Sequence, residues 1–252
     1  MKLPKIGIIY GGIFWQKHPW EGLLTDFYLI DLYKISKKSI QNRRIPFYKY
    51  DIVIVPWAPD QIFLKDNEYQ IHRFLRSGGI LVAFGEFDLN WLPDIRWRFK
   101  LFNDIKIVDN SKKIFDNISN DEISNWDDSA HGYFTGTPPK SRVIVIANEN
   151  NKQYTIGYTD TESSSGSVLA LTMDPDFHSY NGIDGATKLL KNIIEWAFVE
   201  YFVKVEKGII TEWNLKQRVL ISSIPNVVQI LIAAAVVLLT SGLFYLLLRL
   251  LL

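Results

Sequence analysis

Two segments, YDIVIVPW at 50–57 and FLRSGGILVAFGEF at 74–87, decide the fold class of this sequence. Each contains a predicted strand, at 51–56 and 79–84, whose residues after the leading Asp51 or Gly79 form an apolar run with β-branched residues. A helical pattern at 66–77 lies between the two strands. Uninterrupted runs of this length are typical of strands that are buried on both faces, as in parallel sheets. The two segments therefore predict a strand–helix–strand unit.

The same alternation continues on both sides of this unit. The remaining apolar runs and helical patterns are predicted strands at 5–10, 142–147 and 167–172, and predicted helices at 21–38 and 183–203. Strands that alternate with helices predict an α/β domain whose parallel-rich, doubly wound sheet is covered by helices on both faces. We expect this domain to occupy residues 1–203, which is long enough for one substantial core.

The composition narrows the possible functions. The 252 residues include 28 Lys and Arg, 27 Asp and Glu, and no cysteine. A net charge of +1 argues against binding to nucleic acid through global charge, and no direct nucleic-acid contact is expected. The absence of cysteine excludes disulfides, thiolate zinc sites and cysteine nucleophiles. No phosphate-binding glycine motif occurs, so nucleotide hydrolysis has no support and no cofactor is expected.

The end of the chain is strongly apolar. Residues 230–248, ILIAAAVVLLTSGLFYLLL, contain no charged side chain. A helix of this length spans roughly 28 Å, close to the ~30 Å hydrocarbon core of a bilayer. A buried core helix is the alternative, but it would normally show a polar face. We therefore predict a transmembrane tail anchor at 227–252, joined to the domain by a juxtamembrane connector at 204–226.

Basic residues on the two sides of the apolar run predict its orientation. Those before the run are Lys204, Lys207, Lys216 and Arg218, whereas Arg249 alone follows it. Basic residues are enriched on the cytoplasmic side of membrane spans. The chain is therefore expected to cross the cell membrane once, with its N-terminal domain in the cytoplasm.

A second basic segment lies within the domain, at 34–49. It contains no acidic residue, and its basic residues are Lys34, Lys37, Lys38, Arg43, Arg44 and Lys49. Anionic lipid attracts such residues by about 1 kcal/mol each near the surface. The residues expected to contact anionic lipid are Lys34, Lys37, Lys38, Arg43, Arg44, Lys216 and Arg218. The alternatives for 34–49 are a solvated helix end with a loop, or a site for an acidic partner or nucleic acid.

Four segments carry a resemblance to a known family: 50–57, 74–87, HGYFTG at 131–136, and GSVLALTMDPDFHSYNGIDGATKLLKNIIEWA at 166–197. Together they resemble the class I glutamine amidotransferase-like superfamily, particularly its trehalose-utilisation-like branch, over most of residues 3–200. This resemblance implies a flavodoxin-like or amidotransferase-like α/β fold.

The residues that carry catalysis in that superfamily are missing. Its catalytic members place a cysteine on the turn after the strand that corresponds to 80–84, and a His-Pro-Glu motif after a late strand. Here the turn reads AFGEF at 83–87, and the late motif reads Asp174-Pro175-Asp176. Without the thiol and the histidine that activates it, amidotransfer is excluded and no catalytic residue is assigned.

Other polar residues fall in the corresponding region and form a candidate pocket: Glu86, His131, Asp174, Asp176 and His178. Open α/β sheets bind ligands beyond the carboxyl ends of their strands, where these residues are expected to converge. Carboxylates with a histidine are suited to binding a divalent metal or to acid–base catalysis. In the alternative interpretation, Asp174 caps a turn, Asp176 is solvated and His178 packs against Tyr180.

A tail anchor behind a degenerate pocket predicts a non-enzymatic membrane effector or sensor. The layout resembles the membrane effectors associated with short archaeal Argonautes in antiviral defence. That resemblance implies recruitment by a nucleic-acid-sensing partner complex, followed by membrane damage. One apolar helix offers no water-filled path, so a homo-oligomer is expected. The alternatives are a membrane-tethered hydrolase or sugar-binding protein that uses the candidate pocket, or an anchor for a soluble partner.

Overall fold

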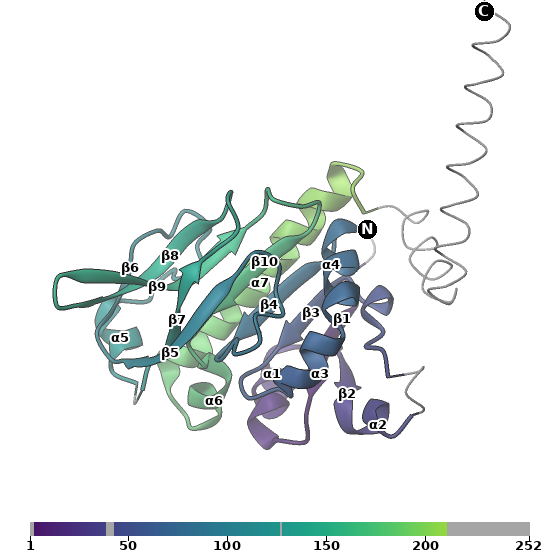
Figure 1. Ribbon diagram of the computed structural model, residues 1–252, viewed down its shortest axis with the longest axis horizontal. Helices are drawn as coiled ribbons and strands as arrows, with labels where there is room; N and C mark the ends of the chain where they lie inside the picture. Colours follow the sequence, from purple (N-terminus) through teal and green to yellow (C-terminus); the bar gives the residue numbers. More distant parts are fainter. Residues whose placement is uncertain (1–2, 39–42, 127, 211–252) are drawn as a thin grey trace, which may run out of the picture. The chain divides into compact units, whose positions relative to one another are not determined.

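The computed structural model describes residues 3–38, 43–126 and 128–210 (Figure 1). The chain divides into two units, and the first, Met1–Thr211, holds every described element. The predicted anchor at 227–252 lies outside the described residues, as do Lys216 and Arg218. Within the described ranges, no helix is both long enough and apolar enough to cross a membrane.

Ten strands in the described part of the chain form one sheet. They are β1 (Ile6–Tyr10), β2 (Tyr28–Asp31), β3 (Ile52–Val55), β4 (Ile80–Phe84), β5 (Arg96–Phe102), β6 (Ile105–Ile107), β7 (Ala130–Gly136), β8 (Arg142–Glu149), β9 (Lys152–Asp160) and β10 (Ser167–Leu171). The sheet runs in the order β2-β1-β3-β4-β10-β9-β7-β5, and β8 pairs with β9 and β6. The first five strands in this order pair in parallel, whereas the pairs beyond β10 are antiparallel.

The predicted mixed α/β fold is confirmed, and each of the five predicted strands is present, as β1, β3, β4, β8 and β10. The parallel-rich prediction describes only the half of the sheet from β2 to β10. In that half, β3, β4 and β10 are buried along their whole length. In the other half, β5 and β7 mix buried with exposed or half-buried residues, as is typical of antiparallel strands with one solvated face.

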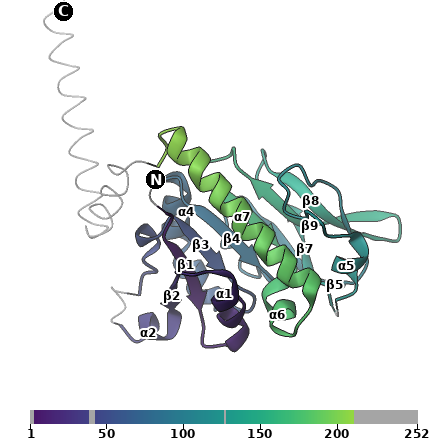
Figure 2. The ribbon, with the colours of Figure 1, turned by 180° about the vertical axis from the view of Figure 1, so that it is seen from behind.

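Helices cover both faces of the sheet. They are α1 (His18–Leu23), α2 (Leu32–Ser36), α3 (Gln61–Asp66), α4 (Glu68–Arg76), α5 (Asn120–Ser124), α6 (Pro175–Tyr180) and α7 (Asp184–Glu206), with 3₁₀ turns η1 (Phe14–Gln16) and η3 (Phe47–Lys49). Helices α3 and α4 lie on the face seen in Figure 1, and α1, α6 and α7 lie on the opposite face (Figure 2). The predicted helix at 183–203 is confirmed as α7.

The predicted single helix at 21–38 is wrong. Helix α1 ends at Leu23, strand β2 follows, and the short helix α2 comes after it. Tyr28 pairs with Gly7 and Asp31 with Tyr10, so β2 extends the parallel sheet beside β1. The Asp31 side chain then accepts a hydrogen bond from the backbone N–H of Lys34 and caps α2. Long-range strand pairing thus outweighs the local helical pattern.

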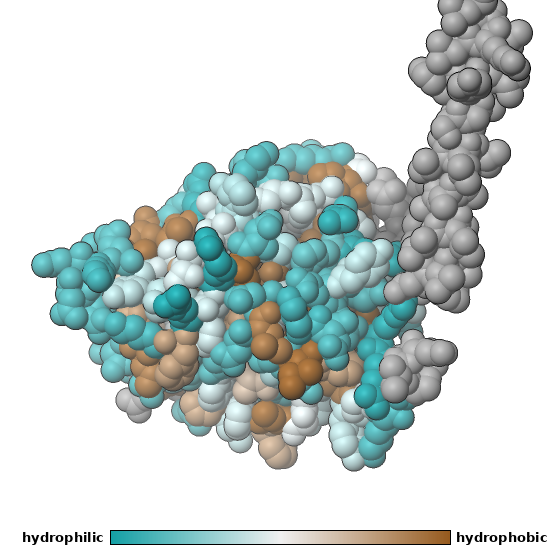
Figure 3. All heavy atoms as spheres, in the orientation of Figure 1, coloured by the Kyte–Doolittle hydropathy of each residue, from teal (hydrophilic) through white to brown (hydrophobic). Residues whose placement is uncertain are grey.

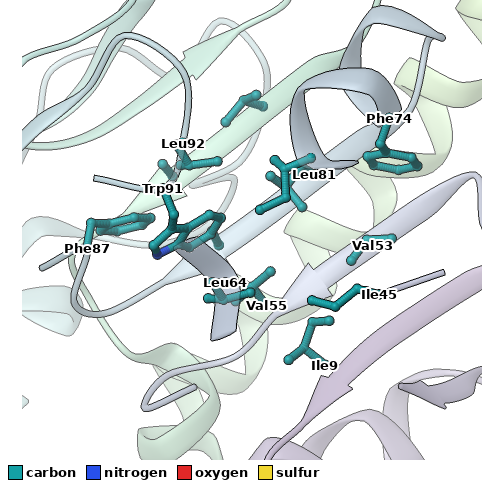
Figure 4. Close-up of a cluster of buried hydrophobic side chains, with 14 of the residues drawn as sticks. Ile9, Ile45, Val53, Val55, Leu64, Phe74, Leu81, Phe87, Trp91 and Leu92 are labelled. Carbon is teal, nitrogen blue, oxygen red and sulfur yellow. The ribbon is translucent and has the colours of Figure 1, made fainter. Parts of the chain in front are cut away.

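The predicted helix at 66–77 is present as α4, and Asn67 separates it from α3, a helix that the sequence pattern did not indicate. This buried side chain accepts a hydrogen bond from Ile45 N at 2.8 Å and donates one to Phe63 O at 2.9 Å. Both helices pack their apolar side chains on the sheet, in the core cluster drawn in Figure 4. Their outer surface is mostly hydrophilic, as Figure 3 shows.

Candidate functional site

The candidate site lies at the carboxyl ends of β4 and β10, which are neighbours in the sheet. Glu86 follows β4 by two residues, and Asp174 follows β10 by three. His131 comes from β7, which reaches the same edge because His131 N donates a hydrogen bond to Thr172 O at 2.9 Å. His178 lies on α6, one helical turn beyond Asp174. The fold thus brings together four of the five residues in the predicted pocket.

These four side chains form a continuous chain of close contacts, called the charge chain below because a charged His131 lies at its centre. His131 Nδ1 lies 3.2 Å from Glu86 Oε1, and His131 Nε2 lies 3.3 Å from Asp174 Oδ2. The other oxygen of Asp174, Oδ1, lies 3.2 Å from His178 Nε2. Asp174 is almost completely buried, with 1% of its surface exposed. The His131 imidazole therefore bridges two carboxylates, and Asp174 links two imidazoles.

The charge chain stabilises a protonated His131. Burial alone would lower the pKa of His131, but Asp174 and Glu86 outweigh burial and raise the pKa to about 10. Burial would likewise raise the pKa of Glu86, yet His131 and Trp57 outweigh it and hold this pKa below its ordinary value. At neutral pH the pair is an imidazolium and a carboxylate. An imidazolium has no free lone pair, so His131 is not available there as a general base.

Asp176 faces a different environment. Its Oδ2 accepts a hydrogen bond from Trp57 N at 2.9 Å, and its Oδ1 has no hydrogen-bond partner among the described residues. Burial, and then the charge of Asp174, raise the pKa of Asp176 to about 8. The interpretation of Asp176 as solvated is therefore wrong: it is a buried carboxyl that is mostly protonated at neutral pH.

The other alternative contacts are also corrected. Asp174 occupies the N-cap position of α6, but its side chain makes no capping hydrogen bond. His178 packs against Trp126, with ring centroids 5.0 Å apart, and not against Tyr180. Tyr180 instead contacts His18, with ring centroids 5.6 Å apart.

The turn after β4 lacks space for a nucleophile. Gly85 has φ +82°, and its N–H is directed at Leu171 O and Met173 O, at 2.9 and 3.0 Å. A Cβ built on Gly85 would overlap the Cδ1 atom of Trp57. Trp57 therefore occupies the space where a side chain at position 85 would lie.

The indole of Trp57 is held in that place from several sides. It stacks on Trp15, with ring centroids 5.7 Å apart, and contacts Phe177 edge-on at 5.0 Å. The buried Gln16 donates hydrogen bonds to Trp57 O and Ala58 O, and accepts one from Gly11 N. Sequence reasoning missed both Trp57 and Gln16 as parts of the site. The position of Trp57 directly after a predicted strand was the one available signal, because residues at the carboxyl ends of neighbouring parallel strands meet.

No group of three or more His, Asp and Glu side chains in the described part of the chain is arranged to hold a metal ion. The site thus holds the charged His131–Glu86 pair and the buried carboxyl of Asp176, beside the Trp57 indole.

The basic segment lies around α2 and β2, the strand at one end of the strand order. Lys34 pairs with Asp31 at 3.2 Å, and the Lys37 ammonium lies 4.0 Å from the centre of the Tyr33 ring. All the predicted lipid-contacting residues of this segment are exposed: Lys34, Lys37, Lys38, Arg43 and Arg44. The exposed rings of Tyr28 and Tyr33 accompany them. This surface, the β2–α2 basic patch, therefore combines positive charge with aromatic rings.

Comparison of the sequence with protein-family models and with curated proteins gives no match. Among solved structures, the chain is similar to Cytoplasmic Protein STM3548 from Salmonella typhimurium, with a TM-score of 0.52 and 12% sequence identity. That alignment covers 76% of this chain and 98% of the Salmonella protein. At this identity the similarity shows the fold alone.

A second solved structure is the exo-beta-1,4-mannosidase Op5Man5 from Opitutaceae bacterium strain TAV5. Its TM-score is 0.40 and its identity 9%, over 77% of this chain and 35% of the mannosidase. A TM-score this low carries no argument about function.

Proposed function

We propose that the protein is a non-enzymatic membrane effector or sensor of antiviral defence, held in the cell membrane by its C-terminal tail with the α/β domain in the cytoplasm. A partner complex, of the kind formed around short Argonautes, recruits or activates it, and several copies then act together on the membrane. The observation that carries this proposal is the uncharged run at 230–248, which matches the thickness of a bilayer.

The geometry of the site supports an effector over an enzyme. A glutamine amidotransferase-like reaction needs a nucleophile on the turn after β4, and Trp57 fills the space beside Gly85. It also needs a histidine that accepts a proton, whereas His131 is held as an imidazolium by two carboxylates. Such a charge chain ties β4, β7 and β10 together, a structural role that requires no substrate.

Expression in a heterologous host tests the proposal. We expect the full-length protein to fractionate with membranes and to depolarise the cells, because the charge-free run prefers the bilayer to water. A chain that ends at Asn226 keeps every described element and is expected to be soluble and harmless. Membrane potential is followed with a voltage-sensitive dye, and fractionation by immunoblot.

The Glu86→Gln variant of the full-length chain is the control for catalysis. A non-enzymatic effector depolarises cells equally well with this substitution. Full-length protein in the soluble fraction without detergent would overturn the membrane assignment, and loss of depolarisation with a folded Glu86→Gln variant would favour an enzyme.

The β2–α2 basic patch provides a second prediction. Replacing Lys37, Lys38, Arg43 and Arg44 with Gln should weaken binding of the chain ending at Asn226 to phosphatidylglycerol vesicles by at least about tenfold at low salt, since each charge contributes about 1 kcal/mol near the surface. The salt dependence of binding should also become flatter. Vesicle co-sedimentation measures both effects.

The matched control changes net charge equally at other exposed positions: Lys106, Lys140, Lys152 and Lys191. If both quadruple variants bind vesicles equally, the attraction depends on net charge alone and the patch has no specific role.

A second candidate function is a membrane-tethered hydrolase or sugar-binding protein. The favouring observation is that the side chains of Glu86 and His131 remain 22% and 14% exposed, so the charge chain reaches solvent. Hydrolysis or binding of nitrophenyl glycosides by the purified protein, lost with Glu86→Gln, would establish this function in place of the first.

A further inference from the structure

A separate cavity lies at the other end of β10 from the candidate site. Its volume is about 640 Å³, within the range of small-molecule pockets. Three segments line it: the C-terminal half of α7, the loop at 161–165 that precedes β10, and residues 111–113. None of these residues belongs to the candidate site or to the β2–α2 basic patch.

Two charged side chains are buried in the wall of this cavity, Glu200 and Lys204. Glu200 is fully paired, because its Oε1 lies 3.1 Å from Lys112 Nζ and its Oε2 accepts a hydrogen bond from Ser167 Oγ at 3.1 Å. Glu200 therefore contacts Lys112 and Ser167 directly, and acts on Lys204 as a nearby charge.

Lys204 retains unused donors. The residue is 4% exposed, and its ammonium donates one hydrogen bond, to Ser165 O at 2.6 Å. An ammonium has three N–H donors, so two of them have no acceptor among the residues that the structure describes and could serve a ligand. Burial lowers the pKa of Lys204 more than the nearby Glu200 raises it, so an anion beside this group would stabilise its charged form.

Further groups in the wall suit a phosphate. Lys113 and Lys207 add two exposed ammonium groups, and Ser164 and Thr161 add hydroxyl groups. Several ammonium and hydroxyl donors in the wall of one cavity match an anion with several oxygens and up to two charges better than a single carboxylate.

The remaining wall suits the body of a nucleoside. Trp196, Val199 and Val203 form an apolar side on α7. Glu162 and Glu195 also line the cavity, and carboxylates accept hydrogen bonds from ribose hydroxyls and base amino groups. The cavity thus offers cations for a phosphate, an apolar wall for a base, and hydrogen-bond acceptors for ribose hydroxyls and base amino groups.

We infer that this cavity binds a nucleoside monophosphate, with the phosphate at Lys204, Lys207 and Lys113 and the nucleoside along Val199 and Val203. The inference is independent of the membrane role, and it adds a soluble ligand to the α/β domain. No bond is made or broken, since the site described here is for binding alone.

Isothermal titration of the full-length protein in detergent tests the inference, with AMP, GMP, CMP and UMP as probes and with adenosine and inorganic phosphate as the two halves of a ligand. At least one nucleotide should bind ten times more tightly than either half. The Lys207→Met and Lys113→Met substitutions, both at exposed positions, should each weaken this binding several-fold. Lys204→Met should weaken it at least tenfold.

Lys191→Met is the control, because Lys191 is an exposed residue of α7 that does not line the cavity. Circular dichroism checks that each variant is folded. If the Lys204→Met variant does not fold, the Lys207→Met and Lys113→Met variants alone test the inference. The inference is overturned if none of the four nucleotides binds, or if binding is the same in the Lys207, Lys113 and Lys191 variants. The assignment to a soluble ligand would also be overturned if phosphatidylglycerol vesicles displaced the nucleotide from the cavity and bound there more tightly.

Discussion

Replacing His131 with Ala is expected to lower the free energy of unfolding at pH 7 by about 3–5 kcal/mol, because it leaves buried carboxylates without their counter-charge. Glu86 and Asp174 both lie within 3.3 Å of the His131 ring nitrogens, and Asp174 is nearly inaccessible to water. Urea titration of the full-length protein in detergent, followed by tryptophan fluorescence, measures the loss. His18→Ala is the control, since His18 is exposed.

The pH dependence of stability gives an independent check on His131. Its pKa is raised from 6.5 in the unfolded chain to about 10 in the folded domain. The stabilisation from His131 is therefore complete below pH 6.5 and is lost as the pH rises towards 10. Asp176 acts in the same direction at lower pH, because its pKa is raised from 3.8 to about 8 and its contribution is lost between those values.

We therefore expect the free energy of unfolding of the unmodified protein to fall between pH 8 and 10, where the unfolded chain has lost the His131 proton and the folded domain still holds it. The His131→Ala variant should show a much smaller decrease over this range, and His18→Ala should behave like the unmodified protein. Equal slopes in all three proteins would mean that the charge chain does not stabilise the fold.

Replacing Gly85 with Ala is expected to lower the free energy of unfolding by about 2–5 kcal/mol. Part of the loss is backbone strain, roughly 1–2 kcal/mol, because residues with a Cβ rarely adopt φ +82°. The rest, about 1–3 kcal/mol, comes from the overlap of the new methyl group with Trp57. The same urea titration measures it.

Gly182 provides a matched control for the backbone. Its φ is +83°, almost the same as that of Gly85, and a Cβ there would meet no atom within 4 Å. Gly182→Ala should therefore cost only the strain. The difference between the two variants isolates the overlap with Trp57, and it should shrink in a Trp57→Ala background. An equal loss at both glycines would show that the space beside Gly85 is open, which would weaken the case against a nucleophile on this turn.

The amino-acid sequence by itself indicated four of the five strands in the parallel half of the sheet, and the acidic and histidine residues of the candidate site. Strands such as β3 and β4 are buried on both faces, so each is a local apolar run that needs no knowledge of its partner. The missing thiol and the uncharged run at 230–248 are likewise properties of single segments. These properties can be identified without a structure, because each depends only on the residue types within one segment.

The tertiary structure alone decided the rest. The segment containing β2 has a helical pattern, and only pairing with β1 makes it a strand. His131 lies 43 residues before Asp174 and 45 after Glu86, and no sequence spacing indicates that its ring bridges them. Trp57 closes the space beside Gly85 through a contact between two different strand ends. Contacts of this kind depend on which distant segments become neighbours in the sheet, and local periodicity carries no information about that choice.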